Sequence, residues 1–327
     1  MATISGPSAA ALHSLSPSDV DFLQSLPKAE LHAHLNGCIP LQTLTDLAEH
    51  LTLSADTTDE IAATVARLKS GLTLNDVSEF FPLFSAIYAI TSTPSALGRV
   101  TRDVLDSFLK AESNPPPGFA YTPAPECSYL ELRTTPRATA QMSRYTYLTT
   151  VLDEIEKFSA DQAALIVSID RRMSEADAKE CVDLAIALRA AGRRVVGLDL
   201  CGDPGKGDIA TFEKHFKRGK DAGLGLTLHI AEVYHIDADK GARRAALKDI
   251  EVLSKRRNGA YKPCIEICLS SNLLSRTTDD TLPFRTTLLA EYAQLLAKPP
   301  LGLGLGREQV KRIAGDGHGS AFCSRQS

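Results

Sequence analysis

LPKAELHAHLNGCI, at residues 26–39, contains a short run in which apolar and polar residues alternate, and two of the polar residues are histidines. Successive side chains of a β-strand point to opposite faces, so His32 and His34, two positions apart, share one face. Two imidazoles on one face can converge on a single cation. The stretch therefore predicts a buried strand that carries the beginning of a metal site.

Similar apolar runs recur along the chain, each ending in polar or ionisable residues, and stretches of helical period separate them. This alternation is typical of βαβ units, in which the carboxyl ends of parallel strands gather the functional side chains. The predicted helices cover residues 41–51, 97–109, 147–158, 175–190 and 209–222. The predicted strands are AELHAHL (29–35), CSYLELR (127–133), AALIVSID (163–170), RVVGLDL (194–200), LGLTLHIAE (224–232) and PCIEICLSS (263–271).

The bulk composition is that of an ordinary soluble protein. Basic and acidic residues number 36 and 40, hydrophobic residues make up 43% of the 327 positions, and the mean hydropathy is -0.08. Neither a nucleic-acid-binding surface nor a membrane segment is indicated. The N-terminus has no basic and apolar leader, and the seven cysteines form no CxxC pair. We expect a cytoplasmic monomer with reduced thiols and no nucleic-acid or membrane partner.

A second group of metal-binding and acidic side chains lies in the second half of the chain. His229 ends a predicted strand, and Glu232 follows three residues later. This spacing suits one metal ligand and a nearby acid that need not touch the metal. Thr278-Asp279-Asp280 then adds a pair of carboxylates. Together with His32 and His34, these residues favour a hydrolytic zinc site.

Between Ser25 and Asp280 the chain contains, in this order, the motifs LPKAELHAHLNGCI, YLELRTTPR, VSIDRR, GLDLCGDP, LHIAE, CLSSN and TDD. These motifs and their order resemble the adenosine deaminase family. The first motif, with its TTPR and DRR companions, looks like the N(6)-methyl-AMP deaminase subgroup. The resemblance implies a TIM-like (β/α)8 barrel of the metallo-dependent hydrolase type with one Zn²⁺ per chain. It also implies hydrolysis of a 6-amino or 6-alkylamino purine nucleotide, in particular of N(6)-methyl-AMP to IMP and methylamine.

The same resemblance assigns roles to individual residues. It implies zinc ligation by His32, His34, His229 and Asp279, and protonation of the purine ring by Glu232. The residues implied to contact the substrate are His34, Asn36, Tyr88, Thr134, Thr135, Pro136, Arg137, Asp170, Gly202 and Asp280.

Two of these substrate contacts bear on specificity. By the resemblance, Asn36 takes the position of an Asp in classical adenosine deaminases, so the site lacks that negative charge. The Arg137 guanidinium is a natural partner for a phosphate. Tyr88 replaces a His of the subgroup, and its ring either stacks on the base or packs in the core. For Thr134, Thr135 and Asp170 an ordinary loop or capping role is the alternative.

The chain departs from the family in two places. No stretch like the family strand RIGHG, with its His, lies between the HxxE segment and CLSSN, and Asn272 and Asp279 are only seven positions apart. A parallel crossover needs about a dozen residues. We therefore predict an incomplete barrel, in which strands six and eight are not evident, over residues 21–300. A disordered segment is expected over 1–20, and a C-terminal helix with a flexible tail over 301–327.

Two other functions remain compatible with these motifs. One is plain adenosine deaminase, which Asn36 and Arg137 disfavour. The other is a catalytically impaired purine-nucleotide-binding paralogue or splice form, which the absent strand-six His would favour. The retained HxH, HxxE and TDD motifs favour an active enzyme.

Overall fold

A computed structural model describes residues 4–50, 58–70, 81–111, 122–203, 206–229 and 280–322. Five strands alternate with helices along the chain, as the apolar runs predict. The strands are β1 (Ala29–His34), β2 (Tyr129–Thr134), β3 (Ala163–Asp170), β4 (Val195–Cys201) and β5 (Gly225–Leu228). The α-helices are α1 (Gly6–Ser14), α2 (Pro17–Ser25), α3 (Leu41–Glu49), α4 (Thr58–Lys69), α5 (Phe81–Ile90), α6 (Pro94–Leu109), α7 (Arg144–Ile155), α8 (Glu175–Ala190), α9 (Glu213–Asp221), α12 (Thr281–Phe284), α13 (Leu288–Leu296) and α14 (Arg307–Ser320), and the short 3-10 turns are η1 (Leu35–Gly37) and η4 (Ile209–Thr211).

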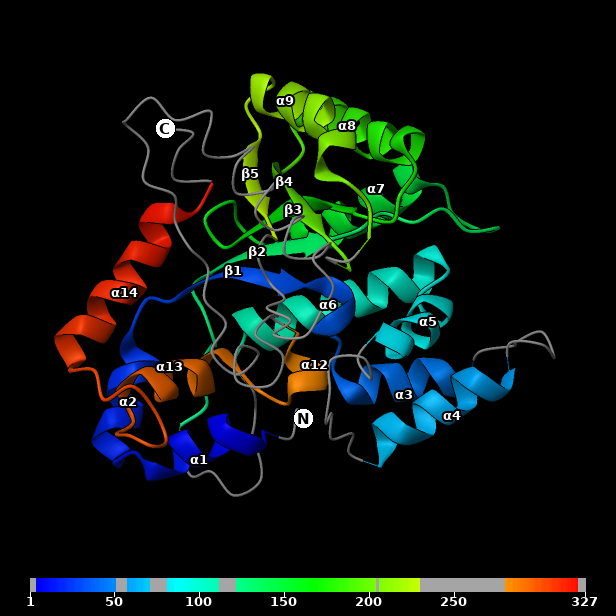
Figure 1. Ribbon diagram of the computed structural model, residues 1–327. Coiled ribbons are helices and arrows are strands. Elements are labelled where there is room, and N and C mark those ends of the chain that lie inside the picture. Colours follow the sequence, from blue (N-terminus) through cyan, green and yellow to red (C-terminus); the bar gives the residue numbers. More distant parts are fainter. Residues whose placement is uncertain are drawn as a thin grey trace, which may run out of the picture.

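The strands form one parallel sheet in the order β1-β2-β3-β4-β5, which curls into part of a barrel (Figure 1). This confirms the predicted α/β barrel class. The strand expected at 263–271 and the gaps expected for strands six and eight fall outside the described residues. Because all five strands run the same way, their carboxyl ends meet at one edge, where His34, Thr134, Asp170, Cys201 and Leu228 are the last strand residues.

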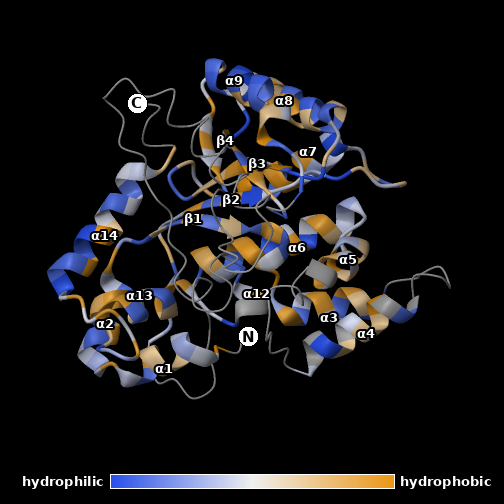
Figure 2. Cartoon of the chain, viewed as in Figure 1, coloured by the Kyte–Doolittle hydropathy of each residue, from blue (hydrophilic) through white to orange (hydrophobic). Residues whose placement is uncertain are grey.

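Helices α6 to α9 cover the outer side of the strands (Figure 1). Leucine and valine side chains between these helices and the sheet form the main core. In Figure 2 the central strands are largely hydrophobic and α9 is largely hydrophilic. Helix α8 begins at a good capping residue, because the Ser174 hydroxyl accepts the backbone N–H of Asp177 at 3.1 Å. Acidic residues in its first turn and Arg189 in its last suit the helix dipole. None of the described helices is long and apolar enough to span a bilayer.

The inner side of the sheet has its own small apolar cluster, which includes Leu31, Tyr129 and Ile166. Phe322, which follows α14, packs against this cluster and lies so close to Gly197 and Gly225 that a side chain at either position would overlap its ring. Phe322, the last described residue, therefore packs on the inner side of the sheet near the amino ends of the strands, away from the carboxyl edge.

The expectation of a disordered segment at residues 1–20 is wrong for its described part. Residues 6–14 and 17–25 are helices, and α1 packs on α13 (Figure 1). Ala11 and Leu12 are buried, and the Ser5 N–H donates to the Arg285 carbonyl at 2.9 Å. The Ser- and Ala-rich composition suggested disorder, but burial of a few apolar side chains against a distant helix is enough to order the segment.

The glycine-rich stretch at 315–322, expected to be a flexible tail, is also ordered. Helix α14 continues to Ser320 and packs beside β1. Three glycines weaken a helix by roughly 1 kcal/mol each relative to alanine. Gly317 nevertheless lies against Ala29, and the His318 ring nitrogen is 3.0 Å from the Ser128 hydroxyl. These tertiary contacts outweigh the low helix propensity.

Candidate functional site

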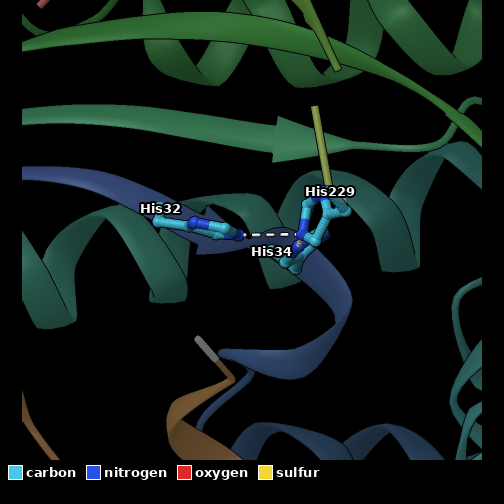
Figure 3. A group of neighbouring side chains, drawn as sticks. All are labelled: His32, His34 and His229. Atoms are coloured by element: carbon cyan, nitrogen blue, oxygen red, sulfur yellow. Dashed lines mark hydrogen bonds between the residues drawn. The ribbon is translucent and has the colours of Figure 1, made fainter. Parts of the chain in front are cut away.

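Three histidines meet at the carboxyl edge of the sheet (Figure 3). The Nε2 atom of His229 lies 2.9 Å from that of His32 and 3.2 Å from that of His34. For a tetrahedral zinc ion with Zn–N bonds of about 2.0–2.1 Å, ligand nitrogens are separated by about 3.3 Å. The cluster has the donor type and the spacing of three zinc ligands, and it brings together the three histidines that the sequence singled out.

A bulge in β1 helps to place His32. Between Glu30 and Ala33 the strand has one residue more than the paired part of β2, and the Glu30 carboxylate accepts the His32 N–H at 2.8 Å. Bulges re-aim side chains and are frequent next to active sites. Beyond the bulge, His34 pairs in register with Arg133. The sequence pattern predicted the strand and the shared face of the two imidazoles, but not the bulge.

Asp199, on β4, contacts the His229 imidazole at Nδ1, the ring nitrogen that faces away from His32 and His34. Its Oδ1 lies 2.9 Å from His229 Nδ1, and its side chain is fully buried. The Arg133 guanidinium, also fully buried, lies 3.7 Å from the same oxygen. A carboxylate that accepts the Nδ1 proton leaves Nε2 as the metal-binding nitrogen and raises its basicity. Asp199, His229 and the cluster thus have the carboxylate–histidine–metal arrangement.

The electrostatics keep two of these imidazoles neutral. Burial lowers the pKa of His32 and of His34 well below the usual value, and the charges of Arg133 and His229 lower both further. Burial would raise the pKa of Asp199, but the charge and hydrogen bond of His229 and the charge of Arg133 outweigh it and hold that pKa well below its usual range. The neutral form is the one in which His32 and His34 can bind a metal ion.

Asp280 and Asn36 lie buried beside this cluster. The Asp280 carboxylate lies so close to Gly37 that a side chain at position 37 would overlap it. Burial raises the pKa of Asp280 to about 7, against the opposing charges of His229 and Arg133. Asp280 Oδ1 and Asn36 Oδ1 have no hydrogen-bond partner within the described part of the chain. Buried polar atoms without partners are uncommon and suit a site that a ligand completes.

Arg137 lies over the ring of Tyr88. Its guanidinium carbon is 4.2 Å from the ring centroid, and its Nη atoms donate to the Tyr88 carbonyl at 3.0 Å and to the Thr91 hydroxyl at 2.8 Å. The buried Nε of Arg137 has no partner among the described residues. Burial raises the pKa of Tyr88, so its hydroxyl stays protonated. The structure thus pairs one face of Tyr88 with Arg137.

The other predicted substrate contacts follow β2, β3 and β4. Thr134 is buried and its hydroxyl lies 2.7 Å from that of Tyr147, which is a structural contact. Thr135 Oγ1 lies 3.5 Å from Cys201 Sγ, at the end of β4. Pro136 is buried between Thr135 and Arg137.

Asp170 and Gly202 are neighbours at the same edge. Gly202 has a φ of 96°, and a side chain there would overlap the Asp170 carboxylate. The Arg172 guanidinium donates two hydrogen bonds to that carboxylate, at 2.9 and 2.6 Å, and the Arg172 backbone N–H donates a third at 2.8 Å. The hydrogen bond and charge of Asp170 raise the pKa of Arg172. Glu232 and Asp279, the predicted proton donor and fourth ligand, lie outside the described residues.

Sequence reasoning missed three charged residues around the histidines: Arg133, Asp199 and Arg171. A signal for one of them exists, since Asp199 interrupts an otherwise apolar strand, and a carboxylate in such a place needs a partner. The identity of that partner could not be deduced, because His229 is 30 positions away.

Comparisons with known proteins agree with these motifs. A family model described as adenosine deaminase matches residues 27–242. The adenosine deaminase-like protein of Drosophila melanogaster is 32% identical over 344 residues, which cover 93% of this chain and 94% of that protein. N6-mAMP deaminase of Arabidopsis thaliana is 30% identical over 344 residues, which cover 87% and 89%.

Solved structures give the same result. The crystal structure of Arabidopsis N6-mAMP deaminase has a TM-score of 0.72 and 28% identity, over 92% of this chain and 95% of that one. Arabidopsis ADAL complexed with IMP has a TM-score of 0.68 and 28% identity, over 92% and 94%.

Proposed function

Since this chain belongs to the adenosine deaminase family and is a hydrolytic deaminase, we propose that it is zinc-dependent and that its substrate is a purine nucleotide carrying a 6-amino or 6-alkylamino group. The preferred reaction is hydrolysis of N(6)-methyl-AMP to IMP and methylamine. The observation that carries this proposal is the cluster of His32, His34 and His229 with Asp199 behind it.

The cluster would hold the metal, with Asp279 as the fourth protein ligand by family resemblance. A zinc ion held there would supply Lewis-acid activation of the water that hydrolyses the substrate. Glu232, three residues after His229, donates a proton to the ring nitrogen next to the carbon under attack. In this proposal Asp280 shares a proton with the purine, which its pKa of about 7 and its Oδ1 without a partner in the described chain support.

A phosphate group explains the environment of Arg137. Stacking on Tyr88 and the two donated bonds fix the plane of the guanidinium, and Nε remains as a buried donor without a partner among the described residues. A phosphate oxygen satisfies such a donor. One structural relative, Arabidopsis ADAL, is solved with the nucleotide IMP. These contacts support the proposal that the chain recognises a nucleotide rather than a nucleoside.

Removing Arg137 tests the nucleotide preference. We expect Arg137→Ala to weaken binding of N(6)-methyl-AMP by about 10–100-fold, because a charge-assisted hydrogen bond is worth about 1.5–3 kcal/mol. Affinity for N(6)-methyladenosine should change little. Isothermal titration with both ligands measures the difference, and Arg193→Ala, which removes a guanidinium paired with Asp153 and Glu156 elsewhere on the surface, is the control. Equal affinity of the unmodified protein for nucleotide and nucleoside would favour plain adenosine deaminase.

A further inference from the structure

Arg171 lies directly after β3 and connects three strand ends. Its side chain is buried, with only 3% of the residue exposed. Its backbone N–H donates to the Cys201 carbonyl at the end of β4, and its Nη2 donates to the His229 carbonyl at the end of β5, each at 2.9 Å. One residue therefore reaches from β3 across β4 to the backbone of a metal-site histidine.

The position of this bond in the sheet is informative. The His229 N–H donates to the Leu200 carbonyl at 2.9 Å, which continues the β4–β5 ladder. In a parallel ladder the next bond, to the His229 carbonyl, would come from residue 202. Gly202 has a φ of 96° and turns the backbone out of the strand. The Arg171 guanidinium donates to that carbonyl instead.

Three groups of His229 are thus held by hydrogen bonds. Its N–H donates to the Leu200 carbonyl, its Nδ1 lies 2.9 Å from both Asp199 Oδ1 and the Leu200 carbonyl, and its carbonyl accepts from Arg171. From these contacts we infer that Arg171 is a positioning residue, which fixes the backbone of His229 so that Nε2 stays within reach of His32 and His34. This inference rests on the proposed metal site.

A hydrogen-bond donor is needed for this role, since an apolar side chain would be enough to fill the space. Burying a guanidinium carries a desolvation cost, and apolar side chains of similar volume often replace buried charges with no loss of stability. An apolar side chain at position 171 would fill the volume but donate nothing to the His229 carbonyl. Metal affinity, more than folding stability, should therefore report the loss of Arg171.

The experiment measures zinc affinity by competition with a chromophoric chelator, and the visible spectrum of the Co²⁺-loaded protein, for the full chain and its variants. Arg171→Met removes the donor, and we expect zinc affinity to fall by about 10–100-fold, the usual effect of losing a group that orients a ligand. The Co²⁺ absorption bands should shift. Arg171→Lys keeps a donor and should recover part of the affinity.

Arg194→Met is the matched control. Arg194 also donates to backbone carbonyls, those of Ser159, Ala163 and Phe158, but at the opposite end of the strands. It should lower the melting temperature and leave zinc affinity unchanged. If Arg171→Met does not fold, Arg171→Gln replaces it, with a smaller loss of affinity in the same direction expected.

Three outcomes would overturn the inference. Unchanged zinc affinity in the folded Arg171 variant is the first, and an equal loss in Arg194→Met is the second. The third is an unmodified chain that binds no zinc at all, and only this one also refutes the metal site in the proposed function.

Discussion

Replacing His32 with alanine should lower the zinc content of the purified protein from about one ion per chain to a small fraction of that. A catalytic zinc site has three protein ligands and a water. This cluster supplies three imidazole nitrogens, one from each histidine. Loss of one leaves the His229 and His34 rings without a third nitrogen at the proper distance. Turnover should fall with the zinc content. Metal analysis after dialysis, with activity measured on the same samples, gives both numbers.

The control for this substitution is His50→Ala, which removes an exposed histidine at the end of α3. It should retain full zinc content and full activity. Undiminished zinc in the His32 variant would show that the cluster at the carboxyl edge is not where the metal binds.

Replacing Glu232 with glutamine should lower turnover by about 10²–10⁴-fold, the usual contribution of a general acid–base group. The amide has the size of the carboxylic acid but no acidic proton to deliver to the purine. Zinc content should stay at the level of the unmodified protein, since Glu232 is proposed as a proton donor and not as a ligand. Single-turnover rates at matched zinc occupancy measure the effect.

Glu175→Gln, on an exposed surface pair with Lys214, is the matched control and should leave turnover unchanged. If Glu232→Gln loses its zinc instead, Glu232 is a ligand and the proposed division of roles is incorrect. Full activity with full zinc would mean that another group supplies the proton.

Much of this fold follows from local sequence patterns. Apolar runs that end in polar residues correctly predicted the five described strands, because the strands of a parallel sheet are buried on both faces and are therefore apolar along their length. The HxH spacing placed His32 and His34 on one face, since alternation is a property of the strand itself. The helix expected at 175–190 coincides with α8, where the Ser174 cap and the first-turn acids are local signals.

Features that depend on distant contacts could not be predicted in this way. The pairing of Asp199 with His229 and the reach of Arg171 across β4 depend on how the strands are placed side by side. Helix α1 and the glycine-rich end of α14 have compositions that favour disorder, and their order depends on the packing of α1 on α13 and of α14 on β1. The assignments of Glu232 and Asp279 and the absent strand-six His concern residues 230–279, and they remain predictions.

Direct assay of the reaction is the measurement that tests the proposed function most closely. The purified, zinc-loaded chain is incubated with N(6)-methyl-AMP, and IMP and methylamine are quantified by chromatography and mass spectrometry. We predict equal amounts of the two products, catalytic turnover, and loss of both products when a chelator removes the zinc. Folded, zinc-loaded protein that binds the nucleotide but forms no IMP would contradict the proposal and identify the chain as a purine-nucleotide-binding protein.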